Sequence, residues 1–346
     1  MSRGKVQSAE KENAKKLYEL RSSVDSRLII TSLDEKLIAF LISEGKPVSI
    51  TVLGGKDIYA PESINSGDIV IAYVRDVKND IGAAFIEYAA GKDGYLSLSR
   101  LPNGVTVKQG DLIPVKLFSH AQKGKRAAFT ARIDYSKYPD GEALREKSKH
   151  LTAYSYLYKD DSFIKERINK VFRQDEYSEI VTDDECVYND LKDSFDCIRL
   201  YEDKDFGLAK LYSLKTILEE SVAKKVWLKC GGYLCIEHTE AMTVIDVNSG
   251  KFTPSKGTDK ESAYLSVNLE AAEEVCRQLR LRNISGIIVI DFINLVSEED
   301  RDELMALLKA ESSKDLLKVT VADITALGLV EMTRKKELPP LYEQLR

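Results

Sequence analysis

Short apolar runs alternate with polar turn residues at regular spacing between about residues 57 and 132. Each run has the length of one strand, and Gly, Asp and Asn separate the runs GDIVIAYVRDV, GAAFIEYA, DGYLSLS, GDLIPVKLFSH and KRAAFTARI. Alternation with a period of two is typical of half-buried strands, and several such strands in series predict a small closed β-barrel.

The segments beside this barrel pattern have a different character. Residues 1–26 are polar and rich in Lys and Glu, which predicts a solvated helical extension. Residues 27–53 contain strand-like runs but are too few to fold alone, so they must pack on a later part of the chain. Residues 134–214 are polar, carry both signs of charge and are predicted to be mostly helical.

The last part of the chain combines a β-meander with alternating helices and strands. The stretch SVAKKVWLKCGGYLCIEHTEAMTVIDVNSG predicts strands joined by turns, with Trp227 and Tyr233 among their apolar members. Asn268 is the predicted N-cap of a helix, and Gly286 leads into an apolar run typical of a buried strand. A further helix and strand follow, so the order predicts an α/β fold with several domains.

Composition narrows the possible functions. The 346 residues include 51 Lys and Arg against 56 Asp and Glu, a net charge of −5, which excludes coating nucleic acid through overall positive charge. No apolar run approaches the roughly 20 residues of a membrane span, and the charged N-terminus does not look like a secretory signal. Five scattered cysteines without a Cys-x-x-Cys pair predict reduced thiols in a cytoplasmic protein and no structural zinc.

Local charge modifies this picture within the barrel pattern. The stretch 108–132 holds six basic residues, Lys125 among them, and one acidic residue. Phe85 and Tyr95 fall on neighbouring predicted strands, where two aromatic rings beside a basic edge can stack bases and follow phosphates. The alternative is that Phe85 belongs to the core and the lysines form a solvated rim.

Two aspartates stand directly after apolar strand runs. Asp246 follows MTVI, and Asp291 follows GIIVI. Carboxylates at strand ends lie at a sheet edge, where α/β proteins hold ligands, and a pair of them favours a bound Mg²⁺. Asn248 projects to the same side as Asp246 and can orient a phosphate. The alternative is that both aspartates only accept hydrogen bonds in turns.

The sequence around these aspartates resembles the catalytic core of the ribonuclease E/G family. The stretches EAMTVIDVNSGKF, NLEAAEEVCRQLRLRNISGIIVIDFINL and DITALGLVEMTRKK carry the resemblance, which extends from about Trp227 to Lys336. Upstream, GAAFIEYAAGKDGYLSLS resembles the RNA-binding OB-fold domain of that family, a type shared with ribosomal protein S-one. RLIITSLDEKLIAFLISEGK resembles its first strands.

The resemblance implies roles for individual residues. Asp246 and Asp291 match the two aspartates that bind one Mg²⁺, and Asn248 matches the asparagine that assists at the scissile phosphate. The implied RNA-binding residues are Phe85, Tyr95 and Lys125 of the OB domain and Lys318, which matches a basic position near the pocket for a 5′-monophosphate.

The implied fold is an RNase H-like domain interrupted by the OB-fold domain and followed by a deoxyribonuclease I-like subdomain. The predicted parts are a polar extension (1–26), the first RNase H-like part (27–55), the OB-fold (56–133), a reduced helical region in place of the 5′-sensor (134–214), the second RNase H-like part (215–283) and the deoxyribonuclease I-like subdomain (284–346).

Two departures from the family pattern qualify these expectations. The Gly-Leu-Ile-x-Arg-Thr segment that reads a 5′-phosphate has no counterpart between Arg132 and Leu214. The cysteine motif that joins subunits through zinc does not occur, so any homo-oligomer is expected to form without zinc. The function implied is a Mg²⁺-dependent endoribonuclease that cleaves single-stranded RNA in the cytoplasm to 5′-phosphate and 3′-hydroxyl ends. The alternative is a catalytically silent RNA-binding or assembly factor on the same fold.

Overall fold

The computed structural model describes residues 26–346 except 57, 61–62, 121–125, 204 and 254–258. The predicted extension before Ser26 therefore lies outside the described residues. The chain divides into two compact units. One unit comprises the chain up to Lys56 together with Ile168–Arg346, and the other comprises Asp57–Arg167.

The second unit is the predicted barrel. Its strands follow the closed order β4-β5-β6-β8-β7, because β5 pairs with β4 as well as with β6. All pairs are antiparallel except β6 with β8, which is the arrangement of an OB-like barrel. The strands are β4 (Ile69–Lys78), β5 (Ala83–Ala89), β6 (Lys92–Ser97), β7 (Leu112–Ser119) and β8 (Ala127–Thr130), and β9 (Tyr156–Tyr158) extends the sheet beside β4 after helix α2 (Gly141–Lys147).

The first sheet of the other unit combines the early strands with two later ones. Its order is β11-β10-β1-β2-β3, and β10 pairs in parallel with both β1 and β11. The strands are β1 (Ser26–Leu33), β2 (Lys36–Ser43), β3 (Lys46–Gly55), β10 (Glu179–Thr182) and β11 (Ile198–Leu200). The prediction that 27–53 must pack on a later segment is confirmed. The region 134–214 is less helical than predicted, because it supplies β9, β10 and β11.

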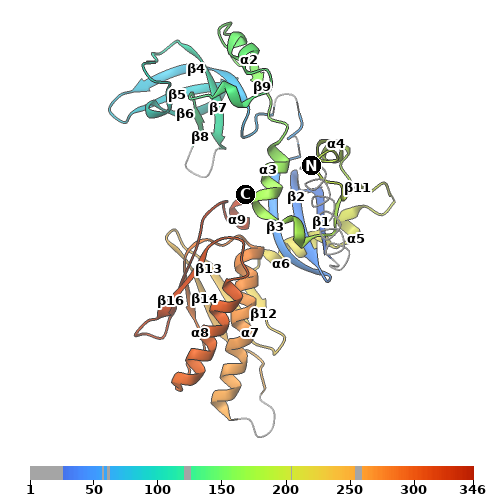
Figure 1. The fold of residues 1–346 in the computed structure, drawn as a ribbon. Helices are drawn as coiled ribbons and strands as arrows, with labels where there is room; N and C mark the ends of the chain where they lie inside the picture. The colour runs from blue at the N-terminus through green and yellow to red at the C-terminus, as the bar shows by residue number, and fades with distance from the viewer. Residues whose placement is uncertain (1–25, 57, 61–62, 121–125, 204, 254–258) are drawn as a thin grey trace, which may run out of the picture. The chain divides into compact units, whose positions relative to one another are not determined.

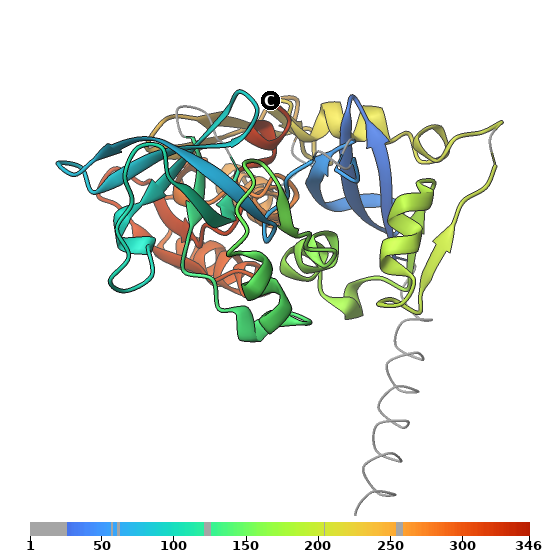
Figure 2. The same cartoon turned by 90° about the horizontal axis from the view of Figure 1, so that it is seen from above.

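Short helices cover this first sheet. Figure 2 shows α6 in yellow beside the blue strands, and Leu214 and Leu218 of α6 pack into the same core as Ile29 and Phe40. The helices of this region are α3 (Phe163–Val171), α4 (Glu185–Leu191), α5 (Leu208–Leu211), α6 (Leu214–Ser221) and α9 (Leu341–Gln344).

The second sheet of the same unit has the order β12-β13-β14-β15-β17-β16. Helices α7 and α8 lie against one of its faces (Figure 1), where Ile245, Ile290, Val275 and Leu308 share one buried core. The elements are β12 (Lys225–Trp227), β13 (Tyr233–His238), β14 (Met242–Asn248), α7 (Lys260–Leu281), β15 (Gly286–Asp291), α8 (Glu298–Ser312), β16 (Val319–Ile324) and β17 (Val330–Arg334).

The meander and the β-α-β order are confirmed in this sheet, since β12, β13 and β14 are antiparallel neighbours and β14 pairs with β15 in parallel across α7. The predicted boundary between 283 and 284 thus falls between two paired strands. Strands β12–β14 belong to the same sheet as β15, through the pairing of β14 with β15, and not to the sheet of β1–β3. The assignment of these parts to RNase H-like and deoxyribonuclease I-like folds stays a prediction.

Helix α7 begins earlier than predicted. Asp259 caps it through hydrogen bonds from the backbone N–H groups of Glu261 and Ser262, both 3.0 Å long. Asn268 is therefore not the N-cap but an interior helical residue, and it is fully buried. The prediction was wrong because Asp259 lies ahead of the apolar pattern on which it was based.

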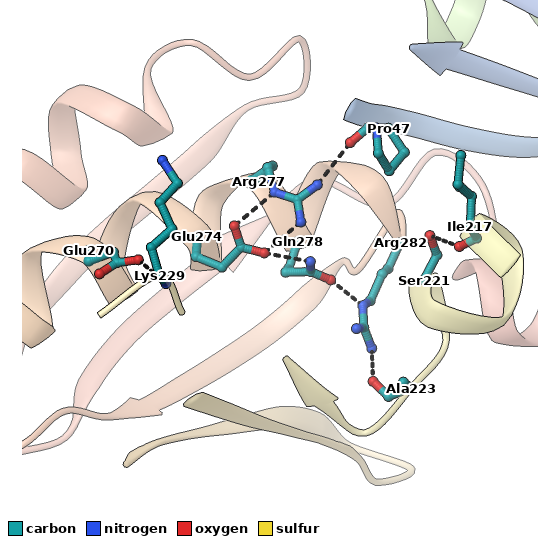
Figure 3. A network of polar contacts seen from close by, with 10 residues as sticks. All are labelled: Pro47, Ile217, Ser221, Ala223, Lys229, Glu270, Glu274, Arg277, Gln278 and Arg282. Atoms are coloured by element: carbon teal, nitrogen blue, oxygen red, sulfur yellow. Dashed lines mark hydrogen bonds and ion pairs between the residues drawn. The ribbon is translucent and has the colours of Figure 1, made fainter. Parts of the chain in front are cut away.

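Polar contacts along α7 join the helix to both sheets of this unit (Figure 3). Glu274 accepts hydrogen bonds from Arg277 and Gln278, each 2.7 Å long, and Arg277 also donates to the carbonyl of Pro47 on β3 at 2.8 Å. These bonds satisfy side chains that would be costly to bury alone.

Arg282 continues the network toward β12. Its Nε donates to Gln278, and its Nη1 donates to the carbonyl of Ala223 at 2.7 Å. Burial lowers the pKa of Arg282 to about 10.

None of the helices in the described part of the chain has both the length and the apolar character needed to cross a membrane.

Candidate active site

The two predicted aspartates are direct neighbours in the second sheet. Strands β14 and β15 are parallel, and their register places Asp246 opposite Asp291. Paired residues of parallel strands point to the same face, and the strands lie about 4.8 Å apart. Ile245 and Ile290, one position earlier, point into the core, whereas both aspartates are exposed on the face opposite α7 and α8. The register therefore brings two carboxylates together on an open surface.

Asn248 belongs to the same group. It lies two residues after Asp246, so it points to the same face of β14. Its Nδ2 donates a hydrogen bond to Asp246 Oδ2 at 2.5 Å. The contact fixes the orientation of that carboxylate and leaves a second N–H on the same nitrogen.

Asn268 is a residue of this region whose role the sequence did not reveal. Its Nδ2 donates to the carbonyl of Ile293 at 2.7 Å, and its Oδ1 accepts from the Ile293 N–H at 3.0 Å. The buried side chain of α7 thus holds the backbone two residues after Asp291. A polar residue at a core position of a helical pattern was the available signal, and it was interpreted as a cap.

The carboxylate pair suits a small hard cation. Two exposed carboxylates side by side repel each other unless a cation lies between them. Mg²⁺ commonly takes one or two protein carboxylates and completes its octahedral shell with waters and substrate phosphate oxygens. In the part of the chain that the structure describes, no three His, Cys, Asp or Glu side chains gather at one point. The donors therefore fit an ion shared with substrate better than an ion enclosed by protein.

The barrel presents the predicted aromatic pair. Phe85 on β5 lies directly opposite Tyr95 on β6, and their rings form an edge-to-face contact with centroids 6.4 Å apart and planes at 68°. Both side chains are half-buried, and the exposed Arg126 holds its guanidinium 4.7 Å from the Phe85 ring centre. Lys125 lies outside the described residues. Among the described residues, Arg126 is thus the cation that lies beside this aromatic pair. The sequence had indicated it only as part of a basic stretch.

An exposed aromatic side chain elsewhere on the barrel was not predicted. Phe118 on β7 is 57% exposed, and the guanidinium of Arg100 lies 3.9 Å from its ring centre. The contact is a cation–π pair at the surface. The alternation in LIPVKLFS, which places Phe118 on the same side of β7 as Lys116, was the signal available for it.

Lys318 is not brought together with the aspartates. It is exposed directly before β16, at the end of the sheet where Val319 and Gly286 both lie opposite Arg334. Asp291 is five residues further along β15 than Gly286, a separation of roughly 17 Å along the strand. Any role of Lys318 must concern another part of a bound RNA than the phosphate at the carboxylate pair.

Comparison with known proteins places the chain in a family. A model of the ribonuclease E/G family matches residues 119–337. The chain is 36% identical over 212 residues to ribonuclease E of Synechocystis sp. (strain ATCC 27184 / PCC 6803 / Kazusa), which covers 58% of this chain and 31% of that protein. It is 44% identical over 126 residues to ribonuclease G of Escherichia coli (strain K12), covering 36% of this chain and 25% of the relative.

A third relative is ribonuclease G of Haemophilus influenzae (strain ATCC 51907 / DSM 11121 / KW20 / Rd), 36% identical over 203 residues, which are 56% of this chain and 40% of that protein. The chain thus spans between a quarter and two fifths of the length of these relatives. The family match covers well over half of the chain and includes both aspartates. The chain belongs to the ribonuclease E/G family.

Proposed function

We propose that this protein is a Mg²⁺-dependent endoribonuclease that hydrolyses single-stranded RNA to 5′-phosphate and 3′-hydroxyl ends, in cytoplasmic RNA processing or decay. The observation that carries the proposal is the pairing of Asp246 with Asp291, with Asn248 bonded to the first of them. The names of the relatives, ribonuclease E and ribonuclease G, support the same class of activity.

The residues of the open face have separate tasks in this proposal. Asp246 and Asp291 would hold the cation between them. When bound, Mg²⁺ supplies positive charge beside the scissile phosphate and lowers the pKa of water, the proposed nucleophile. Asn248 uses one amide N–H to orient Asp246, and its second N–H is the donor that we assign to a phosphate oxygen.

The barrel supplies RNA affinity rather than chemistry. Phe85 and Tyr95 offer aromatic surfaces for bases, and Arg126 offers a cation for the backbone. Because the whole chain is acidic, this local patch has to provide the favourable electrostatics.

Cleavage of an unstructured RNA by the full chain tests the proposal. We expect cleavage with Mg²⁺ and none with EDTA. Asp246→Asn and Asp291→Asn should each slow cleavage about 1,000-fold or more, because a catalytic metal contributes several kcal/mol of charge stabilisation. Binding of RNA without metal should stay within about three-fold of wild type, since neither carboxylate attracts the RNA. Asp302→Asn, on the exposed side of α8, is the matched control and should cleave normally.

Two outcomes would redirect the proposal. Equal cleavage by wild type and Asp246→Asn would remove the assigned site. Tight RNA binding with no Mg²⁺-dependent cleavage would favour the alternative function, an RNA-binding or assembly factor. Substrates with matched 5′-monophosphate and 5′-hydroxyl ends, tested with Lys318→Ala, report whether Lys318 takes part in reading the 5′ end.

A further inference from the structure

An aromatic corner stands on the same open face as the carboxylate pair. It consists of Lys225 and Trp227 on the edge strand β12 and Tyr233 on β13. Trp227 lies directly opposite Tyr233, with ring centroids 5.3 Å apart and planes at 62°. The Nζ of Lys225 lies 4.0 Å from the Trp227 ring centre and 3.5 Å from that of Tyr233. Trp227 nevertheless remains 54% exposed, so a large part of its surface is open to a ligand.

The turn behind the corner is fixed from two sides. Glu270 of α7 accepts hydrogen bonds from the backbone N–H groups of Lys229 at 2.5 Å and of Cys230 at 3.1 Å (Figure 3 shows Lys229). Gly250 packs so closely on Tyr233 that a Cβ there would lie 3.1 Å from the ring. The corner is therefore held before any ligand arrives, which lowers the entropic cost of binding.

The register places the corner beside the carboxylates. Tyr233 lies opposite Asn248, and the next row of the open face runs Lys225, Cys235, Asp246, Asp291. Rows on one face are two residues apart along the strand, about 6.8 Å, and neighbouring strands are about 4.8 Å apart. Trp227 therefore lies two strands and one row from Asp246, roughly 12 Å away on the same face, so an RNA strand with a phosphate at the aspartates can place a nearby base at the corner.

The charge of Lys225 is free for a ligand. Among the described residues no carboxylate forms an ion pair with it, and its contacts are with the two rings. The adjacent Lys224 differs, because it forms an ion pair with Glu237. A cation held over aromatic rings beside an exposed indole is the combination that single-stranded nucleic acids bind through phosphate contact and base stacking.

We infer that the aromatic corner is a nucleobase subsite: a base near the scissile phosphate stacks on the exposed face of Trp227, and Lys225 contacts an RNA phosphate. Its place near the cleaved bond rests on the proposed function, whereas its capacity to bind RNA does not. A purely structural role, in which Trp227 only covers the edge of the sheet, predicts no response of this side chain to RNA.

Trp227 is the only tryptophan of the sequence, so its fluorescence reports on this subsite alone. The experiment titrates the full chain, in EDTA, with a short oligoadenylate and with an abasic oligomer of the same length. We expect saturable quenching by oligoadenylate, with a midpoint equal to the dissociation constant measured by anisotropy of labelled RNA. The abasic oligomer should bind without quenching. Unchanged Trp227 fluorescence while labelled RNA binds would overturn the proposal.

Variants separate stacking from charge. Trp227→Phe keeps an aromatic ring, so its dissociation constant for RNA should stay within about three-fold of the wild-type value. In Trp227→Leu the dissociation constant should rise by about five-fold or more. Lys225→Ala should reduce the slope of log affinity against log salt by about 0.7, the value for one phosphate contact on a single strand. Lys224→Ala is the matched control and should leave quenching and slope unchanged. Wild-type affinity in Trp227→Leu would overturn the stacking role.

The fluorescence titration and the cleavage assay together test the subsite and the proposed nuclease activity independently. Quenching without any Mg²⁺-dependent cleavage would remove the nuclease and leave the subsite. Cleavage without quenching would remove the subsite and leave the nuclease. No binding of RNA by any measure would overturn both.

Discussion

The face of the barrel and the open face of the second sheet use the same aromatic arrangement. Each has two rings on directly opposite residues of antiparallel strands, at 68° for Phe85 and Tyr95 and at 62° for Trp227 and Tyr233. Each has a cation over a ring, which is Arg126 in the barrel and Lys225 in the sheet. On these grounds alone both would be assigned to RNA binding.

The neighbouring strands make the difference. In the barrel, the row of Phe85 and Tyr95 continues to Ala128 on one side and to Asp76 on the other, and Asp76 is ion-paired with Lys78 at 2.9 Å. In the sheet, the row beside the rings ends in two exposed aspartates on parallel strands. Both rows adjoin a parallel strand pair, but that pair carries Ala128 in the barrel and two aspartates in the sheet. The comparison teaches that an aromatic pair gives a surface affinity for RNA, and that the side chains of the adjacent strands decide whether chemistry can be added.

The largest effect within this comparison is expected at Asn268. Asn268→Ala leaves the N–H and C=O of Ile293 without their partner, which should lower the free energy of unfolding by about 2–4 kcal/mol. Cleavage should fall, because the backbone after Asp291 is no longer held. Urea denaturation and RNA cleavage measure the two effects, and Asn189→Ala, on the exposed surface of α4, is the control. Full cleavage activity in Asn268→Ala would mean that the backbone after Asp291 needs no such support.

Phe85→Ala tests the barrel half of the comparison. Loss of one stacking ring should weaken RNA binding by about five- to 100-fold, whereas the cleavage rate at saturating RNA should stay close to wild type. Anisotropy and single-turnover cleavage separate affinity from rate. Phe206→Ala, an exposed phenylalanine of the other unit, serves as the matched control. A loss of rate at saturation as large as the loss of affinity would show that the barrel contributes to chemistry.

The smallest effect is expected from two histidines, one in each unit. Burial lowers the pKa of His238, Arg282 lowers it further and Glu343 opposes the shift. Partial desolvation and then Arg167 lower the pKa of His120, whose imidazole is still exposed at one side. Unfolded histidine binds a proton near pH 6.5, so the unfolded state takes up protons first as the pH falls. Stability should therefore decline from about pH 7 downward and level off below the folded pKa values.

Two histidine variants show which unit is responsible for the loss of stability at low pH. His238→Gln should flatten the pH dependence of urea unfolding in the unit with the two sheets, and His120→Gln should flatten it in the barrel. Titration of each imidazole by NMR gives the folded pKa directly. A folded value at or above 6.5 for either residue would contradict the expected sign.

Alternation of apolar and polar residues was enough to predict the barrel and the meander. Each contains hairpins of strands that are neighbours in sequence, such as β4 with β5 and β13 with β14, so local pattern and turn residues reveal their strands. Strands β10 and β11 were missed because each has only three or four residues and β10 pairs with β1 about 150 positions away. Local patterning carries little information about such distant pairing.

The site was predicted in parts. Strand-end aspartates could be recognised in the sequence, but their register, which makes them neighbours, depends on how the α7 crossover that joins the two strands packs on the sheet. Trp227 was counted among the apolar members of the meander, yet it lies on an edge strand with its ring half exposed. Hydropathy identifies residue types but does not distinguish the covered face of a sheet from the open one.

The parallel pairing of β14 and β15 also has a consequence for how the protein is made. No hairpin can join two parallel strands, so the carboxylates meet only after the α7 crossover has been synthesised and packed. A slip of one residue in register would turn Asp291 toward the core. On the proposed function, a nascent chain can therefore cleave RNA only after the crossover has been made and has folded.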